Sequence, residues 1–305
     1  MSAARSSNHP DPVSGNIAAF FDLDGTLLPL PSLERRFAAA LRSRRAIPPG
    51  NYFRWLAQAI RLAPQGVSAV THANKMYLRD ISANRQTLPA GTGTQASVRV
   101  NCATAASVLS TRDQLPVFFP DAIDRIVWHI ESGHAIVLVT GTLAPLASEA
   151  ALILTLRLAA RGIPTSITVC ATRLEQANER WTGRIEGEAI FGAAKARAAE
   201  TIAAQKDFDL ARCYAYGDSA NDRWMLGAVG CPAAVNPSRA LERIARLRHW
   251  PIFRWEPNAA RHAGPSAPAA GLFTGRGFVG TTMKTQRRST LDDNRIPNIK
   301  SENLG

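Results

Sequence analysis

Two aspartates separated by a single residue, Asp22 and Asp24, follow directly after the apolar segment at residues 17–21. Carboxylates this close repel each other, and carboxylates are rarely buried without a partner of opposite charge. A bound cation would remove the repulsion, and Mg²⁺ is the metal favoured by a site of several carboxylates without His or Cys. The spacing therefore predicts a magnesium-dependent site at the carboxyl end of a first strand.

Polar residues also follow two later apolar segments, and a lysine lies in the helical segment ahead of the second one. In open parallel sheets, ligands bind at the carboxyl ends of the strands, so residues far apart in the sequence can meet in one pocket. The pattern therefore predicts that these side chains join the two aspartates in a single site. The set comprises Thr140, Gly141, Lys195, Asp218, Asn221 and Asp222.

These residue types suit the transfer of a phosphoryl group. A threonine hydroxyl and backbone amides can hold phosphate oxygens, and a lysine can neutralise the charge that develops on the transferred group. A carboxylate beside the metal can attack phosphorus and form an aspartyl-phosphate. The second aspartate points elsewhere, because alternate side chains diverge in extended chain, and it is free to transfer protons.

The segments that carry these residues predict an α/β fold with a Rossmann-like parallel sheet as its core. Apolar strands without polar alternation are separated by helical segments, which is typical of a parallel sheet covered on both faces. The expected strands are residues 17–21, 135–140, 166–171, 212–219 and 231–236, and the expected helices are 121–132, 143–161, 193–205 and 238–248.

A block of helical segments interrupts this alternation after the first strand, and it predicts an inserted helical cap. Helical patterns cover residues 32–41, 52–63 and 67–78. The small and polar residues 87–113 favour a loop or an irregular insertion instead. We expect a disordered leader at 1–15, a core at 16–31 and 119–250, a cap at 32–118, and a mostly disordered tail at 251–305.

The composition restricts the class of protein. The 305 residues carry a formal net charge of +12, which favours anionic partners or simply arginine-rich, solvated helix faces. The four cysteines are too widely spaced for a disulfide framework or a zinc site, and Cys170 and Cys213 are expected to be buried thiols. Residues 1–15 lack an apolar signal core, and no segment is apolar enough to span a membrane. These features exclude a transport ATPase and favour the cytoplasm.

Four motifs resemble those of the haloacid dehalogenase superfamily of hydrolases. They are DLDGTL at residues 22–27, VLVTGT at 137–142, Lys195, and GDSAND at 217–222, in the order and spacing of that superfamily. The stretches around the second motif, and WTGRIEG ahead of the lysine, resemble the branch that includes phosphoserine phosphatase (subfamily IB), which has a helical cap after the first motif. The resemblance covers residues 17–250.

The resemblance implies a role for each candidate residue. The cofactor that it implies is Mg²⁺, which agrees with the metal expected from the carboxylates. Asp22 would be the nucleophile and a metal ligand, Asp24 the general acid and base with its main-chain carbonyl on the metal, and Asp218 the third metal ligand. Thr140, Gly141 and Lys195 would bind the phosphoryl group, and Asp222 and Asn221 would support them.

The sequence departs from phosphoserine phosphatase at the start of the cap. That enzyme has a glutamate shortly after the first motif, which reads the ammonium group of its substrate. Pro29, Leu30 and Pro31 occupy that region in this chain, and Glu34 comes several residues later. We therefore expect phosphoserine to be a poor substrate.

The leading hypothesis is a magnesium-dependent phosphomonoester hydrolase that acts on a small phosphorylated metabolite through an aspartyl-phosphate. A phospholipid head-group phosphatase is the enzymatic alternative, because the early arginines would give a basic cap. A non-catalytic module that binds a phosphorylated ligand is a further alternative, although the intact motif residues argue against it. A nucleic-acid partner would rest on net charge alone and is disfavoured. The sequence indicates no oligomeric state.

Overall fold

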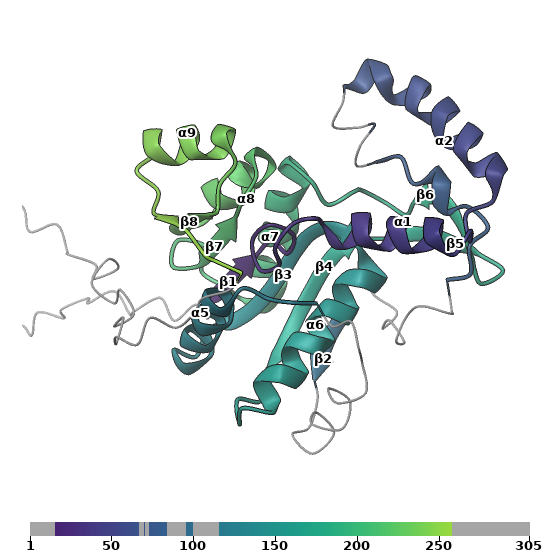
Figure 1. Cartoon of the computed structure of the whole chain (residues 1–305). Coiled ribbons are helices and arrows are strands. Elements are labelled where there is room, and N and C mark those ends of the chain that lie inside the picture. The colour runs from purple at the N-terminus through teal and green to yellow at the C-terminus, as the bar shows by residue number, and fades with distance from the viewer. Residues whose placement is uncertain (1–15, 67–69, 71–72, 84–95, 100–115, 258–305) are drawn as a thin grey trace, which may run out of the picture. The chain divides into compact units, whose positions relative to one another are not determined.

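The computed structural model describes residues 16–66, 70, 73–83, 96–99 and 116–257. Within these residues the chain forms a sheet of seven strands in the order β2-β4-β3-β1-β7-β8-β9 (Figure 1). Six strands run parallel, and β2 pairs antiparallel with β4 at one edge. The predicted α/β fold is therefore confirmed. The strands are β1 Ala18–Phe21, β2 Ala96–Arg99, β3 Ala135–Leu143, β4 Ser166–Thr172, β7 Tyr214–Gly217, β8 Cys231–Val235 and β9 Ile252–Phe253.

The first strand lies in the middle of the sheet, between β3 and β7. Phe20 pairs with Val137 on one side and with Ala215 on the other, and all three strands point the same way. Their carboxyl ends therefore reach the same edge of the sheet, as expected for the predicted site. Because the connections are parallel, residues more than a hundred positions apart in the chain become neighbours at this edge.

Helices cover both faces of the sheet, which explains why its strands are apolar throughout. Phe21 packs in a core with α5 (Pro120–Glu131) and α6 (Ala144–Ala159). Phe20 points to the opposite face and packs in a second core. That second face is covered by α7 (Ala193–Lys206), α8 (Arg223–Gly227) and α9 (Arg239–Leu247).

Two helices follow β1, as the sequence predicts. The first, α1 (Leu33–Ser43), begins at Ser32, whose hydroxyl accepts a hydrogen bond from the Arg35 amide at 3.3 Å. The second, α2 (Pro49–Leu62), starts with a proline in its first turn, where no backbone donor is required, and leads into a 3₁₀ turn, η1 (Ala63–Gln65). Leu41 of α1 and Ile47, which lies between the two helices, meet Trp181 in a third apolar cluster, whereas α2 buries only Asn51.

The third predicted helix of this block, residues 67–78, is wrong in its last part. Asn74 and Lys75 are not helical, and only a 3₁₀ turn, η2 (Met76–Leu78), follows them. The Asn74 side chain accepts from the Met76 amide at 3.3 Å and donates to the Trp55 carbonyl at 2.8 Å. An asparagine that hydrogen-bonds nearby backbone in this way competes with the helical pattern. Residues 67–69 and 71–72 lie outside the described part of the chain.

Four strands were not expected from the sequence. Part of the predicted loop at 87–113 is β2, and the start of the predicted tail is β9, which pairs with β8. An antiparallel hairpin of β5 (Leu174–Ala177) and β6 (Arg180–Ile185) forms a separate two-stranded sheet. Each is six residues or fewer, so its alternation is too short to distinguish it from a loop in the sequence. The leader at 1–15 and the tail from 258 lie outside the described residues.

Other predictions concern the cysteines and membrane spans. Cys170 and Cys213 are buried free thiols, as expected. Within the described ranges, no helix combines the length and the apolar character that crossing a membrane requires. The division into core and cap at residues 31 and 118 stays a prediction.

Candidate active site

A cavity of about 700 Å³ opens at the carboxyl ends of β1, β3 and β7. All but one of the predicted site residues line it, although they come from four separate segments of the chain. The exception is Asp222, which is fully buried directly behind the wall. The predicted residues in the lining are Asp22, Asp24, Thr140, Gly141, Lys195, Asp218 and Asn221.

Lys195 joins two of the aspartates. Its ammonium group donates to Asp22 Oδ1 at 2.6 Å and to Asp222 Oδ1 at 2.5 Å, and all three side chains are buried. The other oxygen of Asp222 accepts from the backbone amide of Ser219 at 2.8 Å and from its hydroxyl at 2.7 Å. Asp222 is therefore fixed from two sides and holds the lysine beside Asp22, and its supporting role stays a prediction.

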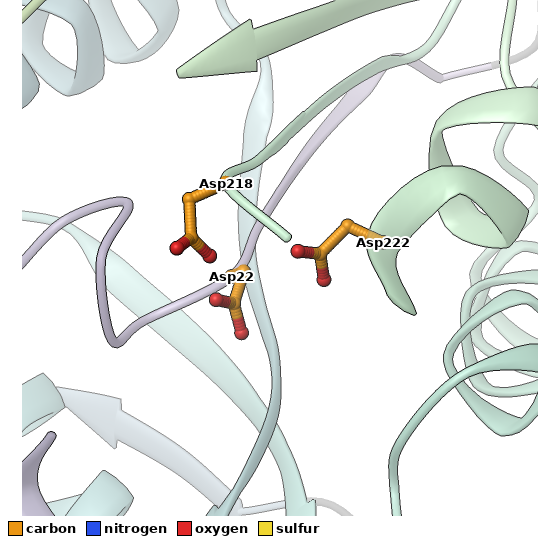
Figure 2. Close-up of side chains that lie close together, drawn as sticks. All are labelled: Asp22, Asp218 and Asp222. Atoms are coloured by element: carbon orange, nitrogen blue, oxygen red, sulfur yellow. The ribbon is translucent and has the colours of Figure 1, made fainter. Parts of the chain in front are cut away.

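Asp22, Asp218 and Asp222 bring their carboxylates together (Figure 2). One oxygen of each lies within 4.8 Å of the others. Two glycines permit this approach: a Cβ on Gly25, which has φ +87°, would lie 2.3 Å from Asp218 Oδ2. A Cβ on Gly217 would lie 2.4 Å from the Asp222 Cβ. Any larger residue at either position would push a carboxylate out of the group.

Burial and the neighbouring charges shift the pKa values of Asp22, Asp218 and Lys195. Burial raises the pKa of Asp22 to about 7, although Lys195 lowers it again in part. Burial and the charges of Asp22 and Asp222 raise the pKa of Asp218 to about 8. Burial alone would lower the pKa of Lys195, but the two carboxylates that it contacts outweigh this effect and raise it. Three carboxylates thus share one ammonium group, and a further positive charge would stabilise their ionised forms.

The residues present fit Mg²⁺. The converging groups are carboxylate oxygens, and neither His nor Cys lies among the residues that line the cavity. Hard oxygen ligands of this kind select Mg²⁺ or a similar hard cation. Asp22 and Asp218 line the cavity, whereas Asp222 does not, and both of its oxygens already accept hydrogen bonds. This difference favours Asp22 and Asp218 as direct ligands.

Asp24 belongs to a different set of contacts. Its Oδ1 accepts from the Leu33 amide at 2.8 Å, and its Oδ2 accepts from the Thr142 hydroxyl. The carboxylate therefore points away from the three converging aspartates, as the alternation of side chains predicts. Burial raises the pKa of Asp24, and these two hydrogen bonds lower it in part. The Leu33 contact also ties the site to the first turn of α1.

The second motif forms another part of the cavity wall, at the end of the strand next to β1. Thr140 is buried at the edge of β3, and its hydroxyl accepts from the Thr142 amide at 3.2 Å. A Cβ on Gly141 would lie 3.2 Å from the Ile190 carbonyl, so the backbone there runs close to its neighbour. The sequence predicted Thr140 and Gly141 as site residues, but the contact of Thr142 with Asp24 was not foreseen.

Helix α2 and the residues around η2 line the cavity with side chains that the sequence analysis did not predict. Tyr52 and Trp55 of α2 line the cavity, and so do Lys75 and Tyr77. A lysine beside a tyrosine in a helical pattern carries no motif, so only the fold could identify this pair. Arg35 and Arg42 of α1 also line the cavity, whereas Arg45, three residues after Arg42, does not.

Glu34 is the acidic residue that α1 contributes to the cavity, and two side chains of the protein already bind its carboxylate. Its Oε1 accepts from the Lys75 ammonium at 2.5 Å and from the Tyr77 hydroxyl at 2.8 Å. Lys75 is buried, whereas the Glu34 side chain is 21% exposed, and both residues line the cavity. A glutamate held in this way has its charge neutralised before any substrate arrives.

Comparisons with known proteins identify the family of this chain. A model of the haloacid dehalogenase-like hydrolase family matches residues 19–227. A relative from Mycobacterium tuberculosis, named phosphoserine phosphatase SerB1, is 29% identical over 284 residues, which cover 90% of this chain and 82% of that protein. The inhibition of morphological differentiation protein of Streptomyces azureus is 32% identical over 240 residues, 77% of each chain.

A solved structure shares the fold. The crystal structure of a protein with unknown function from Bordetella pertussis Tohama I has 27% sequence identity and a TM-score of 0.55, and the match covers 79% of this chain and 99% of that one. The family model spans more than half of the sequence and contains all four motifs. The chain therefore belongs to the haloacid dehalogenase-like hydrolases and is a phosphatase of that family.

Proposed function

We propose that this phosphatase hydrolyses small phosphomonoesters with Mg²⁺ and forms an aspartyl-phosphate on Asp22. The observation that carries the proposal is the setting of the Asp22 carboxylate. One oxygen is held by Lys195 at 2.6 Å, and the group lies at the floor of the cavity beside Asp218. A buried carboxylate that is oriented by an ammonium group and open to a cavity is suited to act as a nucleophile.

The first half of the reaction forms a bond between Asp22 and phosphorus. The free oxygen of Asp22 attacks, and the bond from phosphorus to the leaving oxygen breaks in line with it. Lys195 and the Thr140 hydroxyl neutralise or bind the phosphoryl oxygens as charge develops on them. Mg²⁺, held by Asp22, Asp218 and the Asp24 carbonyl, would supply further positive charge to the phosphoryl group.

Asp24 moves the protons. In its protonated form it donates to the leaving oxygen, which departs as a neutral alcohol. The resulting carboxylate then takes a proton from water, and the hydroxide formed attacks phosphorus and breaks its bond to Asp22. Phosphate leaves, and both aspartates return to their starting states. The hydrogen bonds from Leu33 and Thr142 hold Asp24 in one orientation through both halves.

We expect activity to require Mg²⁺ and Ca²⁺ to inhibit it. Mg²⁺ needs a tight octahedral arrangement, whereas Ca²⁺ takes more oxygen ligands at longer distances. A second oxygen of Asp22 taken up as a ligand could no longer attack phosphorus. Phosphate release from a panel of phosphorylated metabolites, measured after chelation and after adding back each metal, tests this. Full activity after exhaustive chelation would contradict the metal part of the proposal.

The cavity favours a leaving group with negative charge over an amino-acid zwitterion. Arg35 and Arg42 face it from α1, and Glu34 is already paired with Lys75. A substrate ammonium group would therefore find arginines and an occupied glutamate. This supports the expectation that phosphoserine is a poor substrate. Its kcat/KM should be at least about tenfold lower than that of the best anionic or polyol phosphate.

Arg42→Ala should change substrate preference, and Arg45→Ala provides the matched control. Both arginines are exposed and close in sequence, but only Arg42 lines the cavity. We expect Arg42→Ala to lower kcat/KM about tenfold for substrates with a second anionic group, equal to about 1.4 kcal/mol, and to spare neutral polyol phosphates. Arg45→Ala should leave the ratio unchanged. Equal losses on every substrate, or phosphoserine as the best substrate, would contradict this selection by the arginines.

A further inference from the structure

Helix α2 exposes most of its large apolar side chains. Soluble amphipathic helices normally turn their apolar stripe toward the core. On α2, Phe53 is 76% exposed, Leu56 54% and Ile60 67%. These three lie at helical spacings of three and four residues and therefore share one face. We call Phe53, Leu56 and Ile60 the α2 apolar face. None of them lines the cavity, unlike Tyr52 and Trp55 of the same helix.

Hydrogen bonds, rather than the apolar stripe, hold α2 to the chain around it. Asn51 is the one buried residue of this helix. Its side chain donates to the carbonyl of Tyr77 at 3.3 Å and to that of Arg79 at 2.6 Å. Asn74 fixes the next turn by donating to the Trp55 carbonyl. Because polar contacts orient the helix with its apolar face outward, that face is available to a partner.

The charge around this face is strongly positive. Residues 32–83 contain nine Lys and Arg residues and two acidic residues, a net charge of +7 out of +12 for the chain. Arg54 and Arg61 lie along one flank of the α2 apolar face, since each follows one of its members in the helix. Arg54 also donates to Asn51 Oδ1 at 3.0 Å and lies 3.8 Å from an Asp80 oxygen, so Arg61 is the better candidate for a contact with a partner. An exposed apolar stripe bordered by arginines is the pattern of a helix that lies in a membrane interface.

We propose that the α2 apolar face docks on an anionic lipid surface. The three side chains would enter the boundary between head groups and acyl chains, while the arginines contact lipid phosphates. A second copy of the chain fits less well, because two segments of net charge +7 would repel each other. Nucleic acid also fits less well, because two of the three side chains, Leu56 and Ile60, offer bases no stacking surface.

Vesicle sedimentation of the full chain tests this proposal. We expect the protein to sediment with vesicles that contain about 30% phosphatidylglycerol, and not with pure phosphatidylcholine vesicles. Raising the salt well above about 0.1 M should weaken the binding, since the charges are then screened. The triple variant Phe53→Ser, Leu56→Ser, Ile60→Ser should bind at least about tenfold more weakly. Arg61→Gln should weaken binding to the anionic vesicles about fivefold.

Leu247→Ser is the matched control. Leu247 is 81% exposed on α9, at the far end of the sequence from α2, and its replacement should leave binding unchanged. Hydrolysis of a soluble substrate should be the same in all these variants, which separates docking from the proposed chemistry. If the triple variant is misfolded by circular dichroism, Ile60→Ser alone replaces it.

Several results would overturn the proposal. They are equal binding to both kinds of vesicle, no binding to either, or anionic binding that persists in the serine variants. Sedimentation velocity should find the same oligomeric state in the wild type and the triple variant. Self-association that the serine changes abolish would assign the α2 apolar face to a second copy instead. Retention on nucleic acid that depends on this face would also contradict a lipid partner.

Discussion

Asp22→Asn should lower kcat by at least about a thousandfold and leave the fold intact. The change keeps the shape of the side chain but removes the attacking oxygen and one expected metal ligand. Lys195 keeps its contact with Asp222, so the buried ammonium group is not left unpaired. Because burial, and to a smaller extent the carboxylates of Asp222 and Asp24, raise the pKa of Asp22, removing its charge should also spare or raise the thermal midpoint without metal.

Steady-state rates and thermal unfolding of the same preparation test both parts of this prediction. Asp209→Asn is a suitable control, because Asp209 is an aspartate outside the cavity. More than a tenth of wild-type activity in Asp22→Asn, in a preparation free of contaminating phosphatase, would exclude Asp22 as the nucleophile. A collapse of the thermal midpoint would mean that the loss of activity reflects unfolding.

Asp24→Asn should separate the two halves of the reaction. An asparagine can keep both contacts, since its oxygen accepts from Leu33 and its amide donates to Thr142. Turnover of an alkyl phosphate should fall by about 10²- to 10⁴-fold, because asparagine can neither protonate the leaving oxygen nor take a proton from the attacking water. The leaving group of 4-nitrophenyl phosphate departs without a proton. With this substrate, the first half of the reaction, which is the transfer of the phosphoryl group to Asp22, should therefore proceed.

Rapid mixing with 4-nitrophenyl phosphate measures this difference. The Asp24→Asn variant should release one equivalent of 4-nitrophenol per enzyme in a burst, followed by a slow phase limited by water attack on the phosphoenzyme. Absence of the burst, with the alkyl and nitrophenyl substrates depressed by the same factor, would show that Asp24 does not carry the proton.

The core of the site could be predicted from the sequence because parallel strands impose its geometry. Each motif follows an apolar segment, and the carboxyl ends of β1, β3 and β7 meet at one edge. Asp22, Thr140 and Asp218 are therefore brought together by topology alone. Lys195 required one further step, since it sits in the first turn of α7, the helix that leads into β7.

The part of the cavity lined by α1, α2 and the residues around η2 could not be predicted in the same way. Its contacts join residues such as Glu34 and Lys75, which are 41 positions apart and follow no regular pattern. The sequence even suggested a helix through Lys75, and only the Asn74 side chain shows why the helix stops there. Likewise, helical spacing gives no sign that Arg42 faces the cavity and Arg45 does not.

The short edge strands could not be predicted from the sequence for a different reason. β9 has two residues, and its place in the sheet depends on pairing with β8 rather than on its own sequence. Trp255 then packs into the core beside Tyr216, so the chain stays ordered beyond the predicted end at residue 250. Such tertiary contacts override a local sequence that reads as coil.

Chemical trapping of the phosphoenzyme tests the central claim most directly. Borohydride reduces an acyl phosphate to an alcohol, so an aspartyl-phosphate becomes homoserine, whereas a free carboxylate is unchanged. The Asp24→Asn variant, quenched with borohydride during turnover of 4-nitrophenyl phosphate and digested for mass spectrometry, should carry homoserine at position 22. Homoserine at any other aspartate, or an unmodified Asp22 in a sample that has given its burst, would contradict the proposed mechanism.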